Sequence, residues 1–125
     1  MNIRSIAFAG LIGTLGLANF AAADATLKSV AELNQNKAAL AGQTIRAEGK
    51  VVKVNNGIMG RNFVHVQDGT GDANSGTNNL VVTSKQTAAV GDQVSVTGTV
   101  VVNRDFGMGY NYPLLIEEAT IAPKK

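Results

Sequence analysis

The sequence predicts a mainly β domain, a small five-stranded barrel preceded by one short helix, and two observations lead to this. Five segments rich in Val, Ile and Thr, most with alternating apolar and polar residues, are separated by turns rich in Gly and Asn. The first segment is long, and its alternation slips by one residue beside Gly49, which is typical of a strand that bends at a barrel corner. An immunoglobulin-type sandwich would need about seven strands. The five-stranded OB-fold-like Greek-key barrel fits best.

The helix and the strands follow in this order along the chain. Ser29-Val-Ala-Glu32 matches a capping box, so a short helix is predicted to begin there. It ends near residues 34–36 or continues towards Leu40. The phase slip at Val51-Val52 predicts a β-bulge in the first strand. The strands are predicted over residues 43–55, 62–68, 80–83, 93–103 and 112–122.

The connections are predicted from their turn residues. Asn55-Asn56-Gly57 is a hairpin turn signal between the first two strands. Asp68-Gly-Thr-Gly71 predicts a tight turn after the second strand. The stretch from this turn to Asn79 is polar and rich in Gly and Asn, which predicts a mobile loop.

The first 23 residues are interpreted as a secretory signal peptide. Arg4 precedes an uncharged apolar run over residues 6–17, and Ala21-Ala22-Ala23 supplies the small residues of a cleavage site. The apolar run is shorter than the roughly 20 residues that a permanent membrane helix needs. We therefore predict an exported protein, periplasmic or secreted, without stable membrane insertion after cleavage, whose single domain covers residues 24–125.

The composition excludes several classes of site. The chain contains no Cys, which rules out disulfides, zinc–thiolate sites, iron–sulfur clusters and cysteine catalysis. Without residues 1–23, ten basic residues stand against nine acidic ones. Such a balance is too close to neutral to argue for nucleic acid by itself. Because the chain can form no disulfide, the barrel must be held together by strand pairing and an aliphatic core alone.

Three segments carry a resemblance to a known family. They are Asn56-Gly-Ile-Met-Gly-Arg-Asn-Phe-Val-His-Val-Gln-Asp-Gly-Thr-Gly71, Gly49-Lys-Val-Val-Lys-Val54 and Val90-Gly-Asp-Gln-Val-Ser-Val-Thr-Gly98. Together they resemble small exported bacterial OB-fold proteins that are commonly labelled nucleotide- or DNA-binding. More loosely, they are similar to the stress-related BOF family and to NrfJ-like domains. The Asp-Gly-Thr-Gly turn is also similar to that of tRNA-anticodon and single-strand-binding OB domains. The resemblance implies a module that binds a nucleotide, a single-stranded nucleic acid or another anionic or oligomeric ligand.

The predicted second strand supplies a candidate binding face. Val64 and Val66 point to one side of it, and Phe63, His65 and Gln67 point to the other. OB-folds bind ligands across their second and third strands and the flanking loops. Aromatic side chains there would stack on bases or sugars, and arginines would contact phosphate. The predicted ligand-binding residues are Arg61, Asn62, Phe63, His65, Gln67, Arg104, Phe106, Tyr110 and Tyr112. The competing interpretation is that the aromatic residues only cover an end of the barrel.

Catalysis is not expected, and neither is a cofactor. His65 is the one histidine, it lies in the middle of a strand, and no serine or threonine sits in a nucleophile elbow. Glu117 and Glu118 are adjacent on a strand, so they are expected to face opposite ways rather than to act as a pair. The sequence therefore predicts a binding protein rather than an enzyme.

Two alternative functions stay open. Val81, Val101 and Leu115 fall on outward positions, where they form either an interface or a second buried layer. With the strand edges and the aromatic loop 104–112, they would suit a structural module with a protein partner in the cell envelope. Met59, His65 and Met108 are soft ligands that would suit Cu(I) in a periplasmic metal accessory protein. The alternating oxygen side chains of residues 72–78 have the spacing of a calcium loop but lack its final Glu.

Overall fold

The structure, a computed structural model, describes residues 25–107 and 109–124. The predicted signal peptide lies outside the described residues. Within those residues, no helix combines the length and the apolar character needed to cross a membrane.

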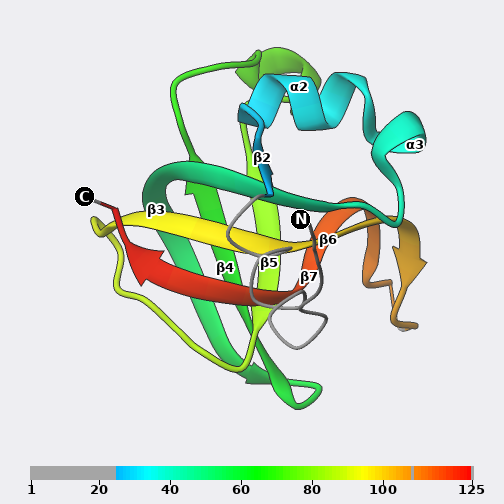
Figure 1. Cartoon of the computed structure of the whole chain (residues 1–125). Helices are drawn as coiled ribbons and strands as arrows, with labels where there is room; N and C mark the ends of the chain where they lie inside the picture. Colours follow the sequence, from blue (N-terminus) through cyan, green and yellow to red (C-terminus); the bar gives the residue numbers. More distant parts are fainter. Residues whose placement is uncertain (1–24, 108, 125) are drawn as a thin grey trace, which may run out of the picture.

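Five strands close into a barrel (Figure 1). They are β3 (Thr44–Ile58), β4 (Arg61–Gln67), β5 (Leu80–Ser84), β6 (Gln93–Asp105) and β7 (Asn111–Pro123). β3 pairs antiparallel with β4 on one edge and with β6 on the other, β6 pairs with β7, and β5 lies parallel to β7. The order β3-β4-β5-β7-β6, returning to β3, is the Greek-key order of an OB-fold, so the predicted fold class is confirmed. A two-residue strand, β2 (Thr26–Leu27), lies parallel to β3.

The predicted hairpin turn between the first two strands is wrong by three residues. Asn55-Asn56-Gly57 lies within β3, and the chain reverses at Met59 and Gly60, whose φ values are +53° and +78°. Two consecutive positive φ values give the turn type that suits a two-residue hairpin. The register shifts between Asn55 and Ile58, so a bulge holds the Asn-Gly pair inside the strand. The strongest local turn signal therefore marks a bulge.

The predicted bulge in β3 is confirmed and lies beside Gly49. The register of β3 against β4 shifts between Val51 and Lys53. A Cβ atom on Gly49 would lie 2.6 Å from the carbonyl oxygen of Gln67 and 2.7 Å from a methyl carbon of Val66. Only a glycine allows β4 to come this close at the bend. The bend lets one strand pair with β6 in its first half and with β4 in its second half.

Two short helices, rather than the one predicted, cover one end of the barrel (Figure 1). α2 (Val30–Gln35) and α3 (Lys37–Leu40) meet at Asn36, where φ is −113°. The predicted capping box is present, because Ser29 Oγ accepts a hydrogen bond from the Glu32 N–H and the Glu32 carboxylate accepts one from the Ser29 N–H. These hydrogen bonds lower the pKa of Glu32. The side chains of Val30 and Leu33 are fully buried, so α2 closes the core at this end.

The Asp-Gly-Thr-Gly turn ties α2 to the barrel. Asp68 Oδ2 accepts a hydrogen bond from the Val30 N–H at 2.9 Å, and Thr70 Oγ1 accepts one from the Ala31 N–H at 2.9 Å. Asp68 Oδ1 also accepts from the Thr70 N–H. Two of the N–H groups that the first turn of α2 leaves free are thus satisfied from the turn after β4. This part of the sequence motif therefore has a structural role.

Replacing Asp68 with alanine is expected to lower the free energy of unfolding by about 1 kcal/mol near pH 7, as loss of a helix cap does. Partial burial alone would raise the pKa of Asp68, but the hydrogen bonds from Thr70 and Val30 outweigh it, so the pKa lies below its usual value. The stabilisation is therefore complete above the unfolded-state pKa of about 3.9 and is lost as the pH falls through the lower folded-state value. Urea unfolding at several pH values measures both.

The difference between the native chain and Asp68→Ala should shrink as the pH is lowered towards 2. Asp105→Ala is the control, because its carboxylate accepts a hydrogen bond from the Gly107 N–H within an exposed turn and, among the residues that the structure describes, from no other group. A difference that grows on acidification would contradict the role given to Asp68.

The expected mobile loop contains a one-turn 3-10 helix, η1 (Ala73–Ser75). Asp72 Oδ1 accepts a hydrogen bond from the Asn74 N–H at 2.8 Å, and the Asp72 N–H donates to Thr77 Oγ1 at 2.8 Å. The Asp72 carboxylate, which a calcium ion would need, thus caps η1. Across the described ranges, no three His, Cys, Asp or Glu side chains gather where they could hold a metal ion.

Candidate functional site

The outer face of β4 carries the side chains that the sequence predicts for it. Val64 and Val66 are fully buried in the core, whereas Phe63 and His65 point to the outside of the barrel. On β5, Thr83 is paired with Phe63 and Val81 with His65. Although it faces outward, Phe63 is only 2% exposed. Something outside the barrel therefore covers it.

The cover is the hairpin formed by the ends of β6 and β7. The Phe63 ring lies 5.7 Å from that of Phe106 and 5.6 Å from that of Tyr112, and these two are 5.9 Å apart. We call these three rings the aromatic cluster. Arg104 pairs with Tyr112 across the hairpin, and the Phe106 N–H donates to the Tyr110 carbonyl oxygen, which closes the turn. The Phe63–Phe106 and Phe106–Tyr112 pairs meet edge to face, at 73° and 75°, which is a preferred geometry of aromatic pairs, whereas the Phe63 and Tyr112 rings are tilted by 34°.

A second buried layer lies beneath the aromatic cluster. Leu115 is fully buried yet does not belong to the core inside the barrel, and Val81 and Val101 are half-buried. Thr83 is 1% exposed. Of the two alternatives for the outward aliphatic residues, burial within this chain therefore holds for Leu115. Because Thr83 pairs beside Phe63, the aromatic cluster covers this layer, which we call the outer core, whereas the competing interpretation placed such a cover at an end of the barrel.

Two arginines border the aromatic cluster and give it positive charge. The guanidinium carbon of Arg61 lies 5.0 Å from the centre of the Phe106 ring, and that of Arg104 lies 4.7 Å from it. Arg104 Nε is 3.8 Å from Glu117 Oε2, whereas Arg61 forms no ion pair with any residue that the structure describes. Both guanidinium groups are within cation–π range of one ring. Together with the aromatic cluster they form what we call the cationic–aromatic face.

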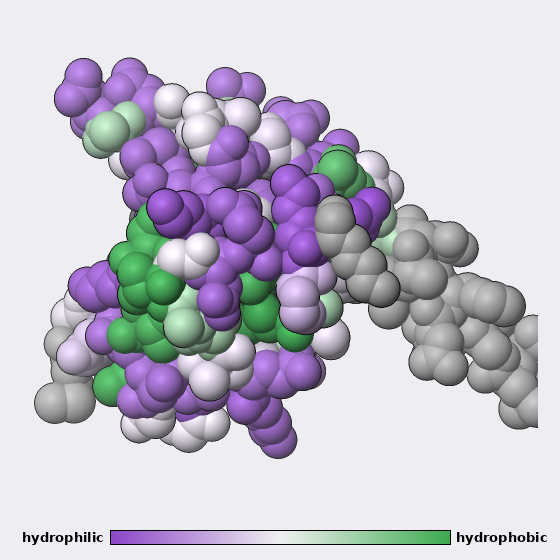
Figure 2. Space-filling view, turned by 90° about the vertical axis from the view of Figure 1, so that its left-hand side faces the viewer, coloured by the Kyte–Doolittle hydropathy of each residue, from purple (hydrophilic) through white to green (hydrophobic). Residues whose placement is uncertain are grey.

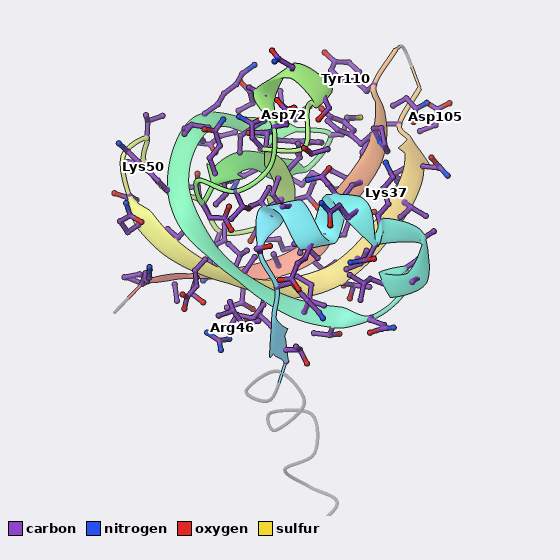
Figure 3. The ribbon with its side chains drawn as sticks, turned by 90° about the horizontal axis from the view of Figure 1, so that it is seen from above. Lys37, Arg46, Lys50, Asp72, Asp105 and Tyr110 are labelled. Atoms are coloured by element: carbon purple, nitrogen blue, oxygen red, sulfur yellow. The ribbon has the colours of Figure 1, made fainter. Side chains whose placement is uncertain are left out.

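The other predicted contact residues lie apart from this face or have other partners. Tyr110 is 48% exposed at the tip of the β6–β7 hairpin, beside Asp105 (Figure 3). The Asn62 side chain accepts from the Gly57 N–H and donates to two carbonyl oxygens of the segment after β5, so it supports the fold. Gln67 is paired with Lys50 at the far end of β4. The structure thus gathers Arg61, Phe63, Arg104, Phe106 and Tyr112.

His65 occupies a half-buried position on the same strand. Its Nδ1 atom lies 3.3 Å from the amide nitrogen of Asn79, which follows η1. Burial, and to a smaller extent the positive charge of Lys53, lower the pKa of His65. The ring is therefore neutral at pH 7, and it offers hydrogen bonding rather than charge to a ligand.

The predicted copper ligands are not brought together as far as the structure describes them. Met59 lies in the turn that precedes Arg61, the first residue of β4, and His65 comes four residues after Arg61. At a rise of about 3.3 Å per residue, this places the two backbones roughly 13 Å or more apart. The third predicted ligand, Met108, lies outside the described residues.

A hollow of about 430 Å³ adjoins the cationic–aromatic face between β5 and β7, and we call it the β5–β7 hollow. The expectation that Glu117 and Glu118 face opposite ways is wrong, because both line this hollow. Glu118 has a φ of +51°, and the register of β7 against β6 shifts opposite Gly98. The resulting bulge leaves both glutamates outside, between buried Ile116 and buried Ala119. Arg61, Thr83, Lys85 and Gln86 also line the hollow.

Sequence reasoning missed the β5–β7 hollow for a physical reason. The bulge that brings the glutamates together has no glycine of its own on β7. The one signal lies on the partner strand, where a Cβ atom on Gly98 would be 2.7 Å from a methyl carbon of Ile116 and 2.8 Å from the carbonyl oxygen of Glu117. Only the pairing of the two strands reveals that this glycine faces the bulge.

The side of the molecule away from the β6–β7 hairpin is different in character. Figure 2 shows hydrophilic side chains over most of this side, surrounding smaller hydrophobic areas. Arg46 lies on the opposite side of the barrel from Tyr110 and the hairpin tip (Figure 3). Its guanidinium group pairs with Glu48 at 3.1 Å. Arg46 is thus a matched control for Arg61.

Solved structures of similar shape agree with the OB-fold. The OBody AM3L09 bound to hen egg-white lysozyme has a TM-score of 0.53 and 18% identity, over 78% of this chain and 95% of its own. The Entamoeba histolytica asparaginyl-tRNA synthetase in complex with asparaginyl-adenylate has a TM-score of 0.53 and 12% identity, over 81% of this chain. A structure assigned as an aspartyl-tRNA synthetase from Leishmania major Friedlin has a TM-score of 0.52 and 14% identity, over 82% of this chain.

These similarities show that the fold is shared, and at such identities they show nothing of function. The chain spans about a quarter or less of the two synthetases, 24% and 21% of their lengths. No protein-family model matches the chain. No curated protein matches it in sequence either.

Proposed function

We propose that this protein is an exported, non-enzymatic OB-fold module that binds single-stranded nucleic acid or a nucleotide on the cationic–aromatic face. The observation that carries the proposal is the contact of two guanidinium groups, those of Arg61 and Arg104, with one ring over β4 and β5. This is the face that OB-folds use for oligonucleotides. The arginines supply phosphate contacts, and Tyr110, exposed at the neighbouring tip of the β6–β7 hairpin, supplies stacking surface.

Two likenesses suggest this ligand class. Two of the similar structures are synthetases whose names include tRNA. The sequence resembles OB-fold proteins labelled nucleotide- or DNA-binding over the segments that form β3, β4 and β6. Export is supported by the pattern of residues 1–23, with Arg4, the apolar run and the three alanines.

Not every predicted contact residue is equally available to a ligand. Phe63 is too deeply covered to stack on a base, and the Phe106 ring already contacts two guanidinium groups. The exposed ring of Tyr110 and the guanidinium groups themselves are therefore the first surfaces that a ligand meets. Guanidinium planes can stack on bases as well as pair with phosphates.

A labelled oligothymidylate of about ten nucleotides should bind the native chain more tightly at about 50 mM than at about 200 mM salt. Arg61→Ala should weaken binding and should reduce the salt slope by about 1, because one phosphate contact is lost. Fluorescence anisotropy measures both quantities. Arg46→Ala, on the opposite side, should bind like the native chain. Absence of binding at the lower salt concentration, or equal losses in the two variants, would overturn the proposal.

A protein partner at the same face is the second candidate. The OBody similarity concerns a structure bound to a protein, hen egg-white lysozyme, and the chain covers 95% of it. Tyr110 projects from the β6–β7 hairpin, and exposed tyrosines are common at interfaces. Failure to bind any oligonucleotide would favour this candidate. It would then be tested by capture of envelope proteins with the native chain and with Tyr110→Ala.

A further inference from the structure

We infer that the β5–β7 hollow is a base-binding subsite that favours guanine, an inference that rests on the proposed function because it assigns a part of the same face. Arg61 belongs both to the cationic–aromatic face and to the lining of the hollow. A strand whose phosphates are held at Arg61 would therefore have a base within reach of the hollow. At about 430 Å³, the hollow is in the size range of small-molecule pockets.

Some of the polar groups that line the hollow form hydrogen bonds within the fold, and others do not. Ser84 Oγ donates to the Ala119 carbonyl oxygen at 2.6 Å, and Gln86 Oε1 accepts from the Ile121 N–H at 2.7 Å. Thr83, by contrast, is 1% exposed, and its hydroxyl has no hydrogen-bond partner among the residues that the structure describes. A buried hydroxyl without a partner is costly, and a ligand that supplied one would recover that cost.

The Glu117 carboxylate is the second group with unused capacity. Its side chain is 13% exposed, and its nearest cation, Arg104 Nε, is 3.8 Å away, which is longer than a hydrogen bond. An ionised carboxylate has two oxygens that accept and none that donates. The bulge adds the exposed Glu118 at the rim of the same hollow. The hollow therefore combines acceptors with the positive charge of Arg61 and Lys85.

This combination selects among the bases by their Watson–Crick edges. Guanine presents two adjacent donors, N1–H and the 2-amino group, which match both oxygens of one carboxylate. Adenine and cytosine present one amino group each, and a carboxylate accepts from the amino group of cytosine in known complexes. Thymine and uracil present one N–H between two carbonyl oxygens, and these oxygens would face the carboxylate. Proteins read unstacked bases of single strands by such edge contacts.

The test uses oligothymidylates of about ten nucleotides in which one central base is replaced by guanine or by hypoxanthine, which keeps N1–H but lacks the 2-amino group. The native chain should bind the guanine oligonucleotide about tenfold more tightly than oligothymidylate, with hypoxanthine between them. Glu117→Gln should lose most of this preference. Its affinity for oligothymidylate should not fall, because the variant removes a negative charge. Glu48→Gln, whose carboxylate pairs with Arg46 elsewhere, should keep the preference.

Thr83→Val provides a second variant that should fold well. Removal of an unpartnered buried hydroxyl should leave the melting temperature unchanged or raise it, while the guanine preference falls. A purely structural Thr83 would change only the melting temperature. Equal binding of all three oligonucleotides by the native chain, or a full preference in Glu117→Gln, would overturn the subsite and leave the proposed function standing. Absence of binding to every oligonucleotide would overturn the proposed function itself.

Discussion

Replacing Phe63 with alanine is expected to lower the free energy of unfolding by about 3–5 kcal/mol, although the residue lies on the outside of the barrel. The ring is 2% exposed and contacts both Phe106 and Tyr112. Its removal would leave a cavity under the β6–β7 hairpin and would break two aromatic contacts, each worth about 0.5–1.5 kcal/mol beyond its buried area. Urea unfolding followed by circular dichroism measures the change, and the melting temperature should fall by more than about 10 °C.

Tyr110→Ala is the matched control for Phe63→Ala. It removes an aromatic ring of similar size from the neighbouring hairpin tip, but this ring is 48% exposed and lies outside the aromatic cluster. Its effect on unfolding should stay within about 0.5 kcal/mol, as for other exposed positions. If the two variants were equally stable, the aromatic cluster would not be a lid over an outer core, and Phe63 would return to the set of free contact residues.

Gly49→Ala is expected to destabilise the barrel by about 3 kcal/mol, at the upper end of the usual cost of overpacking. The added Cβ atom would lie 2.6 Å from the Gln67 carbonyl oxygen, and this oxygen belongs to the backbone of β4. Relief therefore requires that β4 move away from β3 at the bend, which weakens the pairing around Val51 and Val66. Thermal unfolding of the purified variant measures the loss.

Gly76→Ala separates this steric effect from ordinary backbone strain. Gly76 has a φ of +75° at the end of η1, and a Cβ atom there would meet nothing within 4 Å. Its substitution should cost about 1 kcal/mol, from the left-handed conformation alone. Gly49 lies outside that conformational region, so its larger cost would come from crowding. A smaller loss in Gly49→Ala than in Gly76→Ala would show that β4 gives way easily.

Much of the fold follows from local patterns in the sequence, because those patterns act through short-range physics. The capping box at Ser29 and the bulge at Val51 are confirmed, since each depends on residues a few positions apart. The Asn55-Asn56-Gly57 signal failed because the pairing of β3 with β4 sets the register, and the chain reverses at Met59 instead. The local sequence indicated an irregular backbone at Asn55-Asn56-Gly57, but it could not distinguish a turn from a bulge.

Part of the candidate site was predictable from the sequence, and the rest was not because it depends on tertiary structure. The outward position of Phe63 follows from strand alternation, and its approach to the 104–112 segment follows from the OB-fold. Its burial does not follow, because the curvature of the hairpin over β4 is a tertiary property. The β5–β7 hollow also depends on long-range pairing, since Gly98 and the bulge at Glu118 meet only when β6 and β7 are aligned.

The position of β3 in the barrel sets an order for assembly. This strand pairs with β4, which follows it at once, and also with β6, where Thr44 meets Thr99. A chain that emerges N-terminus first can therefore form the β3–β4 hairpin early, while the first half of β3 keeps an open edge until β6 has been made. Such long-range closure slows folding and leaves a strand edge exposed in the meantime. Until β6 is in place, this edge can pair with the strand edges of other chains.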